Sequence, residues 1–252
     1  MKTVVIIQAR MGSSRLPGKV MKELYGKTVL EHVVERVRQS EEVNEIIIAS
    51  TVQRNDDMIE IEASKIGVKL FRGSESDVLS RYYYAAKENK TDIVVRITSD
   101  CPLIDSKIVD KVIRFYKDHD YPYVSNSSSD PSKATFPRGL DTEVFGFEYL
   151  EEAFFNAKED YQREHVTPYF YEESKEFYIY KNDKDYSKYR WTLDTEEDWS
   201  LIQEIYENLY KGQHDFFMED VIALMEDKPD LFNINKDIKQ KKIELSRHRG
   251  IR

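Results

Sequence analysis

Three cations stand close together near the N-terminus, in the stretch QARMGSSRLPGK that spans residues 8–19. They are Arg10, Arg15 and Lys19, and together they can offset most of the charge of a triphosphate. Gly12 lets the backbone come close to a ligand, and the two serines that follow it offer hydroxyl and amide donors. The stretch therefore predicts a phosphate-binding loop, with an ordinary basic surface turn as the alternative.

Two common phosphate-binding motifs do not fit this stretch. Gly12 and Gly18 are separated by five residues where the P-loop has four, and Val20 follows Lys19 where the P-loop has a serine or threonine for magnesium. The dinucleotide fingerprint also fails, because no glycine stands two residues after Gly12. The loop is thus neither a standard P-loop nor a nicotinamide-dinucleotide site.

Two aspartates complete the candidate site, since phosphate chemistry usually needs magnesium and magnesium prefers carboxylate oxygen. Asp100 follows a predicted strand at residues 92–98, and Asp194 ends a predicted strand at residues 189–194. If both strands belong to one sheet, the two carboxylates can reach the same ion. The alternative for Asp194 is a helix N-cap with Glu197 as its capping-box partner. Asp198 is assigned to the surface of that helix.

The elements that must position these residues alternate along the first 120 residues. Apolar runs predict strands, and apolar positions at helical spacing predict helices, one of which ends at a capping glycine, Gly67. The strands are expected at residues 3–9, 45–51, 68–71 and 92–98, and the helices at 29–40, 58–67, 77–89 and 106–119. Such alternation indicates an α/β fold with a mainly parallel sheet, which binds ligands at the carboxyl ends of its strands.

The pattern changes after about residue 120. Residues 125–139 are rich in serine and proline and are interpreted as a loop or lid. Beyond it we expect strands at 140–147, 176–182 and 189–194, and helices at 147–157, 164–173 and 196–210. Residues 121–190 are interpreted as an insertion lobe on a single domain of residues 1–252, with a basic tail at 236–252. The aromatic residues of the lobe could line a pocket or a dimer interface, although core packing accounts for most of them.

Composition excludes several classes of protein. The net charge of −9 argues against broad nucleic-acid binding, which requires many phosphates to be neutralised. No apolar run is long enough to cross a bilayer, so no membrane partner is expected. The single cysteine, Cys101, cannot form an internal disulfide and is interpreted as a packing residue. A cytoplasmic location is expected.

Six segments, taken in order, resemble the cytidylyltransferase family, which includes the CMP-sialic acid and CMP-Kdo synthetases. They are QARMGSSRLPGK, FRGSESDVLSRYYYAA, RITSDCPLID, RGLDTEVFGFEYLEEA, REHVTPYFYE and RWTLDTEEDWSLI. The spore-coat polysaccharide biosynthesis branch is the most similar, and the resemblance covers residues 3–240. It implies a Rossmann-like nucleotide-diphospho-sugar transferase sandwich that joins CTP to a sugar acid, giving a CMP-sugar and pyrophosphate. It also implies a homodimer.

The resemblance assigns roles residue by residue. It implies catalytic roles for Arg15, Lys19 and Asp100, and Mg²⁺ binding by Asp100 and Asp194. The nucleotide-binding residues that it implies are Gln8, Ala9, Arg10, Met11, Gly12, Ser13, Arg15, Lys19, Arg72 and Ser99. One departure concerns the metal, because some sialic acid synthetases have a second acidic residue where this chain has Thr192.

An acceptor sugar acid carries a carboxylate, so its pocket should offer cations and hydrogen bonds. The candidates are Asp77, Arg81, Arg96, Arg138, Asp141 and His165. Arg96 lies in an otherwise apolar strand and needs a partner, for which a ligand or Asp77 is suggested. Structural alternatives are a helix N-cap for Asp77, a loop ion pair for Arg138 with Asp141, and a packing or capping role for His165.

Other functions stay open at this level. A nucleotidyltransferase that uses another base, a sugar phosphate or a non-sugar acceptor has the same requirements. Glycosyltransferases of similar architecture are disfavoured, because their Asp-x-Asp metal motif is absent from the SDCP segment that contains Asp100. A nucleotide-binding protein that has lost catalysis is the remaining alternative.

Overall fold

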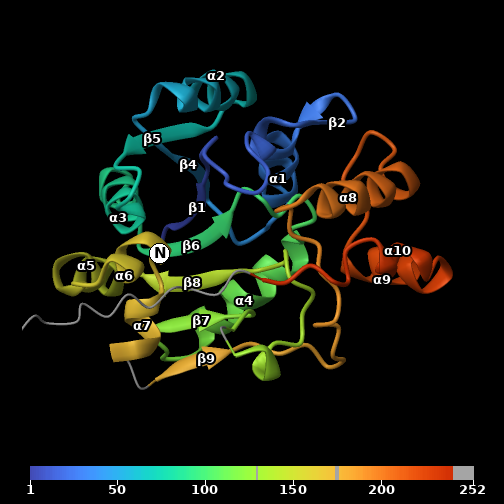
Figure 1. Cartoon of the computed structure of the whole chain (residues 1–252). Helices are drawn as coiled ribbons and strands as arrows, with labels where there is room; N and C mark the ends of the chain where they lie inside the picture. Colours follow the sequence, from blue (N-terminus) through green and yellow to red (C-terminus); the bar gives the residue numbers. More distant parts are fainter. Residues whose placement is uncertain (129, 174–175, 241–252) are drawn as a thin grey trace, which may run out of the picture.

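A computed structural model describes residues 1–128, 130–173 and 176–240 of the chain. Within these residues, seven strands form one sheet in the order β5-β4-β1-β6-β8-β7-β9 (Figure 1). The strands are β1 (Thr3–Gln8), β4 (Glu45–Thr51), β5 (Lys69–Gly73), β6 (Ile93–Thr98), β7 (Tyr123–Ser125), β8 (Glu143–Gly146) and β9 (Phe177–Ile179). A separate hairpin joins β2 (Glu23–Leu24) to β3 (Lys27–Thr28).

The sheet is mainly parallel, as the alternating pattern predicts. β1 pairs in parallel with β4 on one side and β6 on the other, and β5 pairs in parallel with β4. β8 pairs antiparallel with both β6 and β7, so it alone runs against the other strands of the described sheet. The carboxyl ends of β1 and β6 therefore meet at one edge, where the loop of residues 8–19 and Asp100 both begin.

Helices cover both faces of the sheet. α3 and α5 to α7 lie on one side in Figure 1, and α1 and α8 to α10 lie on the other. The helices are α1 (Val29–Val37), α2 (Asp57–Ile66), α3 (Val78–Glu88), α4 (Ser106–Asp118), α5 (Phe147–Asn156), α6 (Asp160–His165), α7 (Pro168–Glu173), α8 (Glu196–Leu209), α9 (Met218–Asp227) and α10 (Asp230–Asn233). This arrangement is the Rossmann-like sandwich. No helix among the described residues has the length and apolarity to cross a membrane.

The central strand shows why a continuous apolar run forms a buried strand. Val5 and Ile7 pack into the core beneath α1 and α4, while Val4 and Ile6 pack into the core beneath α3 and α5. All four side chains have no exposed surface. Because successive side chains of a strand point to opposite faces, a strand covered on both faces must be apolar at every position.

Two helix boundaries follow directly from capping chemistry. Gly67 ends α2 in the left-handed conformation, as predicted, at φ 67°. Asp105 begins α4 by accepting hydrogen bonds from the backbone amides of Lys107 and Ile108. The start of α4 at Asp105 restrains the segment after Asp100, because only four residues separate Asp100 from Asp105.

Two predicted elements are wrong. Residues 189–194 are extended but form only an isolated bridge between Arg190 and Arg138, because their backbone bonds go to two different loops. Trp191 N donates to Arg138 O at 2.7 Å, and Leu193 N donates to Asp100 O at 2.8 Å. The helix predicted at residues 164–173 is instead the end of α6 and the whole of α7. α6 ends at its C-cap residue, Val166, whose φ is 70°, and Thr167 then precedes Pro168, the first residue of α7, so that a helical backbone is disfavoured at Thr167.

The segment interpreted as an insertion lobe contributes to the central sheet. Residues 121–190 contain β7, β8 and β9, together with α5 to α7. Gly139 lies in this segment at φ 102°, and a Cβ there would be 2.6 Å from the backbone of Trp191 and Thr192. Only glycine allows this close approach, which holds the segment that carries Asp194. Most of the predicted basic tail, residues 241–252, lies outside the described residues.

Candidate active site

The loop of residues 8–19 is built around the Met11 backbone. Met11 N donates to Asp56 Oδ1 at 2.7 Å, and Met11 O accepts from the amides of Ser13 and Gly18. Gly18 has a φ of 69°, so the turn requires glycine there. At Gly12 the nearest atom to an added Cβ is a Glu75 oxygen at 3.7 Å, which is ordinary contact. The fold itself therefore does not require glycine at position 12.

Lys19 brings the two candidate metal ligands together. Its ammonium donates to Asp100 Oδ2 at 2.7 Å, to Asp194 Oδ1 at 2.8 Å and to Leu193 O at 2.7 Å. The three bonds use all three ammonium protons. Asp100 and Asp194 thus meet around one cation, although the segment before Asp194 is not a strand of the sheet.

The charges in this cluster hold one another in their ionised forms. Burial alone would lower the pKa of Lys19, but Asp100 and Asp194 outweigh it and the pKa is raised. Burial would likewise raise the pKa of Asp100, but the Lys19 ammonium outweighs it and the pKa is lowered. A donated hydrogen bond from Thr98 Oγ1 to Asp100 Oδ1, at 2.6 Å, acts in the same direction.

The second oxygen of Asp194 binds two arginines. Arg15 Nη2 lies 2.8 Å from Asp194 Oδ2, and Arg190 Nη2 lies 2.9 Å from the same atom. Arg10, in contrast, has an exposed side chain that lies 3.8 Å from Glu75. The loop therefore divides its cations, with Arg15 and Lys19 on the aspartates and Arg10 closer to solvent.

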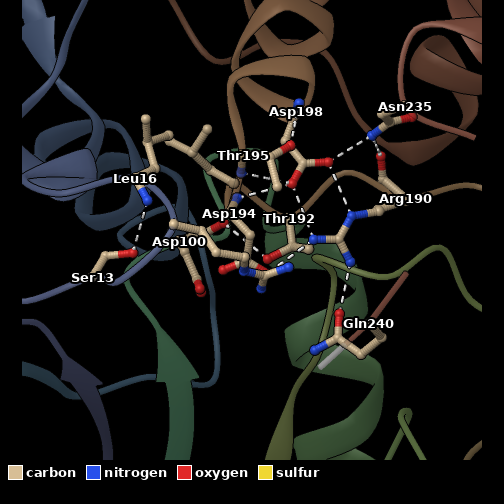
Figure 2. A network of polar contacts seen from close by, with 12 residues as sticks. Ser13, Leu16, Asp100, Arg190, Thr192, Asp194, Thr195, Asp198, Asn235 and Gln240 are labelled. Carbon is tan, nitrogen blue, oxygen red and sulfur yellow. Dashed lines mark hydrogen bonds and ion pairs between the residues drawn. The ribbon is translucent and has the colours of Figure 1, made fainter. Parts of the chain in front are cut away.

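Asp194 is not the N-cap of α8. The capping box consists of Thr195 and Asp198. The Thr195 side chain accepts from the backbone amide of Asp198, and the Asp198 side chain accepts from the backbone amide of Thr195. The assignment of Asp198 to the helix surface is also wrong, because its side chain is fully buried against Arg190 and Asn235 (Figure 2). The ion pair with Arg190 and the capping bonds together explain why a carboxylate is buried here.

The other predicted nucleotide-binding residues divide into two groups. Gln8, Ala9 and Ser99 lie at the carboxyl edge between β1 and β6, where Ser99 N donates to Gln8 O at 3.2 Å. Arg72 lies at the edge strand β5 and does not reach the loop. Its guanidinium forms ion pairs with Asp57 and Glu60 of α2, both at 2.7 Å.

Among the predicted acceptor-binding residues, Arg96 has a partner that sequence reasoning missed. It forms an ion pair with Glu143 of β8, and not with Asp77 as suggested from the sequence. Glu143 Oε1 also accepts from Tyr123 Oη at 2.6 Å and from Thr167 Oγ1 at 2.8 Å. The antiparallel pairing of β6 with β8 sets Arg96 opposite Glu143 in the sheet, which accounts for the contact.

Asp77 and Arg81 lie on α3. Asp77 caps α3 by accepting from Ser80 N, and its other oxygen forms an ion pair with Arg163 at 2.7 Å. Arg81 is buried and donates from Nη1 to Ala49 O, while its Nε has no hydrogen-bond partner among the described residues. Burial lowers the pKa of the Arg81 guanidinium.

The remaining acceptor candidates lie on the loop before β8 and at the end of α6. Burial raises the pKa of Asp141 to about 6, and nearby Arg138 offsets this only in part. His165 is the last residue of α6 and is partly buried. Cys101, interpreted as a packing residue, is buried, and burial raises the pKa of its thiol.

Comparison with known proteins identifies the family. The model of the cytidylyltransferase family matches residues 4–243, nearly the whole chain. The chain belongs to the cytidylyltransferase family. Within it, the chain is 33% identical to the spore coat polysaccharide biosynthesis protein SpsF of Bacillus subtilis, over 89% of this chain and 94% of that protein.

Two solved structures extend the comparison. A cytidylyltransferase from Leptospira borgpetersenii is 35% identical, with a TM-score of 0.86 over 96% of this chain and 99% of that chain. The structure of CMP:2-keto-3-deoxy-manno-octonic acid synthetase complexed with CTP has a TM-score of 0.63 at 18% identity, over 82% of this chain and 99% of that chain. The second likeness supports the fold.

In this member of the cytidylyltransferase family, sequence reasoning missed Arg190 and Glu143. Arg190, Asp194 and Asp198 are spaced four residues apart, which is a signal for a charge network. Arg190 does contact both aspartates, but residues 190–194 are not helical and only Asp198 lies in a helix, so helical spacing is not the cause of these contacts. Glu143 carried no local signal, since its partner lies 47 residues away in the chain.

Proposed function

We propose that this protein transfers a cytidylyl group from CTP to a hydroxyl of a sugar acid. A bond forms between the acceptor oxygen and the α-phosphorus, the bond from that phosphorus to the bridging oxygen breaks, and pyrophosphate and the hydroxyl proton leave. The observation that carries the proposal is the meeting of Lys19, Asp100 and Asp194 beside the loop at the carboxyl edge of β1. Membership of the family and the names of its relatives support the choice of CTP and a sugar acid.

The oxygen atoms around the Lys19 ammonium are suitable ligands for Mg²⁺. Two carboxylate oxygens and one carbonyl oxygen surround the ammonium, and oxygen is the ligand that this ion prefers. Asp100 and Asp194 are proposed to hold the ion in place of Lys19. When bound, Mg²⁺ neutralises charge that develops on the phosphates during transfer.

The loop cations change partners in this proposal. The triphosphate attracts Lys19 and Arg15 away from the aspartates, because a phosphate group offers more negative charge than a shared carboxylate oxygen. Lys19 and Arg15 then stabilise the departing pyrophosphate, while Arg10 and the loop amides bind the remaining phosphate oxygens. Catalysis by positioning and charge requires no protein nucleophile.

The acceptor is proposed to bind on the α3 and α6 side of the sheet. Arg81, Arg138 and His165 supply the groups that recognise a carboxylate, and Asp141 accepts from sugar hydroxyls. The Arg96–Glu143 pair forms the base of this region, where Tyr123 and Thr167 fix its geometry. We further propose a homodimer and a product destined for a cell-surface or spore-coat polysaccharide.

Pyrophosphate release by the purified protein tests the proposal. The assay contains Mg²⁺, each of the four nucleoside triphosphates in turn, and a panel of sugar acids and sugar phosphates. Release with CTP and a sugar acid is expected. Release with another nucleotide, or with a sugar phosphate, would favour a nucleotidyltransferase of different specificity. CTP binding without release for any acceptor would favour a nucleotide-binding protein that has lost catalysis.

A further inference from the structure

Among the described residues, the carboxylate of Asp198 receives more hydrogen bonds than that of either candidate metal ligand. Its carboxylate accepts from Arg190 Nε at 2.9 Å and Arg190 Nη2 at 3.0 Å. It also accepts from the backbone amides of Asp194 and Thr195, at 2.9 and 3.1 Å, and from Asn235 Nδ2 at 2.9 Å. Figure 2 shows these contacts converging on one carboxylate beside Asp194. The side chain has no exposed surface, so it does not contact a substrate.

These bonds fix Asp194 from two directions. The Asp198 carboxylate holds the backbone amide of Asp194, and Arg190 holds the side-chain oxygen Oδ2. The other side-chain oxygen, Oδ1, is thereby turned toward Lys19 and Asp100. A short side chain fixed at both its backbone and one oxygen has little freedom left, so the direction of Oδ1 is set by the network.

The network also joins distant segments of the chain. Asn235, just after α10, donates to both Arg190 O and Asp198 Oδ1 at 2.9 Å. Arg190 Nη1 donates to Gln240 Oε1 at 2.7 Å. The segment after α10 therefore packs against Arg190 and Asp198 and completes the support of Asp194.

We propose that Asp198 and Arg190 are positioning residues that aim Asp194 Oδ1 at Asp100 and so create the metal-binding pair. The proposal rests on the proposed function, in which Asp100 and Asp194 hold Mg²⁺. Replacing a residue that hydrogen-bonds to a metal ligand typically lowers metal affinity or activity by about 10- to 100-fold. Neither residue needs to touch CTP or the acceptor for this effect.

The test compares CTP affinity with and without the metal. Isothermal titration of CTP is carried out in Mg²⁺ and again in EDTA, for the wild type, Asp198→Asn and Arg190→Lys. The ratio of the two affinities measures how strongly the metal and CTP support each other's binding. Lysine at position 190 keeps the charge but cannot bond two carboxylates in a fork. The half-saturating Mg²⁺ concentration for turnover is measured alongside.

Asp110→Asn is the matched control. Asp110 is also a buried carboxylate that accepts backbone hydrogen bonds, from Glu41 N at 3.1 Å and Glu42 N at 3.3 Å, but it lies on α4 away from the site. It reports what the loss of a buried capping carboxylate does to the protein as a whole. Thermal melts of all variants accompany the binding measurements.

The expected result is a selective loss of metal binding. In Asp198→Asn and Arg190→Lys the affinity ratio falls about tenfold or more and the half-saturating Mg²⁺ rises, while CTP affinity in EDTA stays within about threefold. An unchanged ratio in a folded variant overturns the proposal, as does an equal loss in Asp110→Asn. If Asp198→Asn does not fold, Arg190→Lys alone decides. If the wild type releases no pyrophosphate and shows no effect of metal on CTP binding, the proposed function itself fails.

Discussion

Helix α8 has a cluster of titratable side chains at each end. The carboxylate cluster, at its N-terminal end, consists of Lys19, Asp100, Arg190, Asp194 and Asp198. The histidine cluster, beyond its C-terminal end, consists of Lys27, His32, Glu35, Arg36 and His214. Both clusters combine cations with carboxylates, and both include ligands suitable for a metal ion. They differ in how their atoms are bonded.

Neutral tautomers satisfy the histidine cluster completely. His32 Nε2 donates to Leu24 O at 2.6 Å, so His32 Nδ1 is an acceptor. Arg36 can only donate, so His214 Nδ1 accepts from it at 3.4 Å and the proton of His214 lies on Nε2. That proton has two acceptors at 3.2 Å, His32 Nδ1 and Glu35 Oε2. This cluster links α1 to the loop after α8 and needs no ligand.

The carboxylate cluster is bonded by exchangeable charges. Lys19 and Arg15 reach Asp100 and Asp194 from a loop whose cations have an alternative use, which is to bind phosphate. Arg15 is one-third exposed, so a ligand can approach it. The comparison shows that a group of titratable residues indicates a site when its partners can be exchanged for a ligand, and indicates a structural role when each atom already has a fixed partner.

Replacing residues of the carboxylate cluster should have the largest effect on turnover. Lys19→Ala and Asp100→Asn are each expected to lower pyrophosphate release by about 100- to 1,000-fold, because each removes a charge placed for the transition state. His214→Gln, in the histidine cluster, should leave turnover within about threefold when the protein is folded, because distant sites act independently. Initial rates at saturating CTP, with circular dichroism as the control for folding, measure both.

The comparison would be broken by either of two results. Wild-type turnover in Lys19→Ala and Asp100→Asn would show that the carboxylate cluster is not catalytic. A loss in folded His214→Gln as large as that in Asp100→Asn would show that the histidine cluster takes part in the reaction.

Removing the Lys19 ammonium should open the carboxylate cluster to a metal ion before any nucleotide binds. In Lys19→Met, the affinity for Mn²⁺ without CTP is expected to rise about tenfold or more over the wild type. The reason is that the Lys19 ammonium, which hydrogen-bonds to both carboxylates, no longer competes with the metal ion for them. Paramagnetic resonance of free Mn²⁺ measures the affinity, and Lys22→Met, which removes an exposed ion pair with Glu196, is the control. Equal affinity in Lys19→Met and the wild type would mean that Lys19 does not occupy the position of the metal.

The sequence predicted the parts of the fold that local chemistry determines. β4 was predicted with its observed limits because residues 46–49 form an apolar run that suits a strand buried on both faces. α2 ends at Gly67 because the backbone there is left-handed, a conformation that glycine adopts without strain. The extended segment of residues 189–194 was predicted as a strand because its residues suit an extended backbone. Its hydrogen bonds go to residues 138 and 100, and no local pattern contains that information.

The candidate site was predicted in a similar way. The loop cations and the aspartates at the strand ends could be found from residue type and position, and the structure brings Lys19, Asp100 and Asp194 together. Asp198 was placed on the helix surface, because nothing near it in the sequence shows that Asn235 covers it. Supporting residues are set by tertiary contacts, so they are the part of a site that a single sequence predicts least well.

The histidine cluster should make stability depend on pH. Burial, followed by the charge of Arg36, lowers the pKa of His214 to about 3, and burial also lowers the pKa of His32. The unfolded chain therefore binds more protons below about pH 6.5, and the free energy of unfolding falls as the pH is lowered through this range. Between about pH 7.5 and about pH 5.5, the wild type should lose about 1 kcal/mol more than His214→Gln.

Urea unfolding at the two pH values measures this difference. Comparing how the free energy of unfolding changes with pH in the two proteins cancels the packing change that His214→Gln itself causes. It also cancels the opposite contribution of Asp141, whose raised pKa acts equally in both proteins. Equal slopes in the two proteins would show that His214 takes up its proton over the same pH range in the fold as in the unfolded chain, and the fixed neutral tautomer assigned to His214 would then be wrong.

The smallest expected effect is that of zinc. His32, Glu35 and His214 each offer one ligand atom, and these atoms lie within 4.8 Å of one another, a spacing that suits Zn²⁺. An ion on His214 Nε2 would have to displace its proton while Nδ1 still accepts from Arg36, and it would add charge beside Arg36 and Lys27. Excess Zn²⁺ is therefore expected to shift the melting temperature by less than about 1 °C, since an ion that does not bind the native state cannot stabilise it. A rise of several degrees in the wild type, absent from His32→Ala, would mean that ligand spacing outweighs proton placement, and the distinction between exchangeable and fixed partners would not hold.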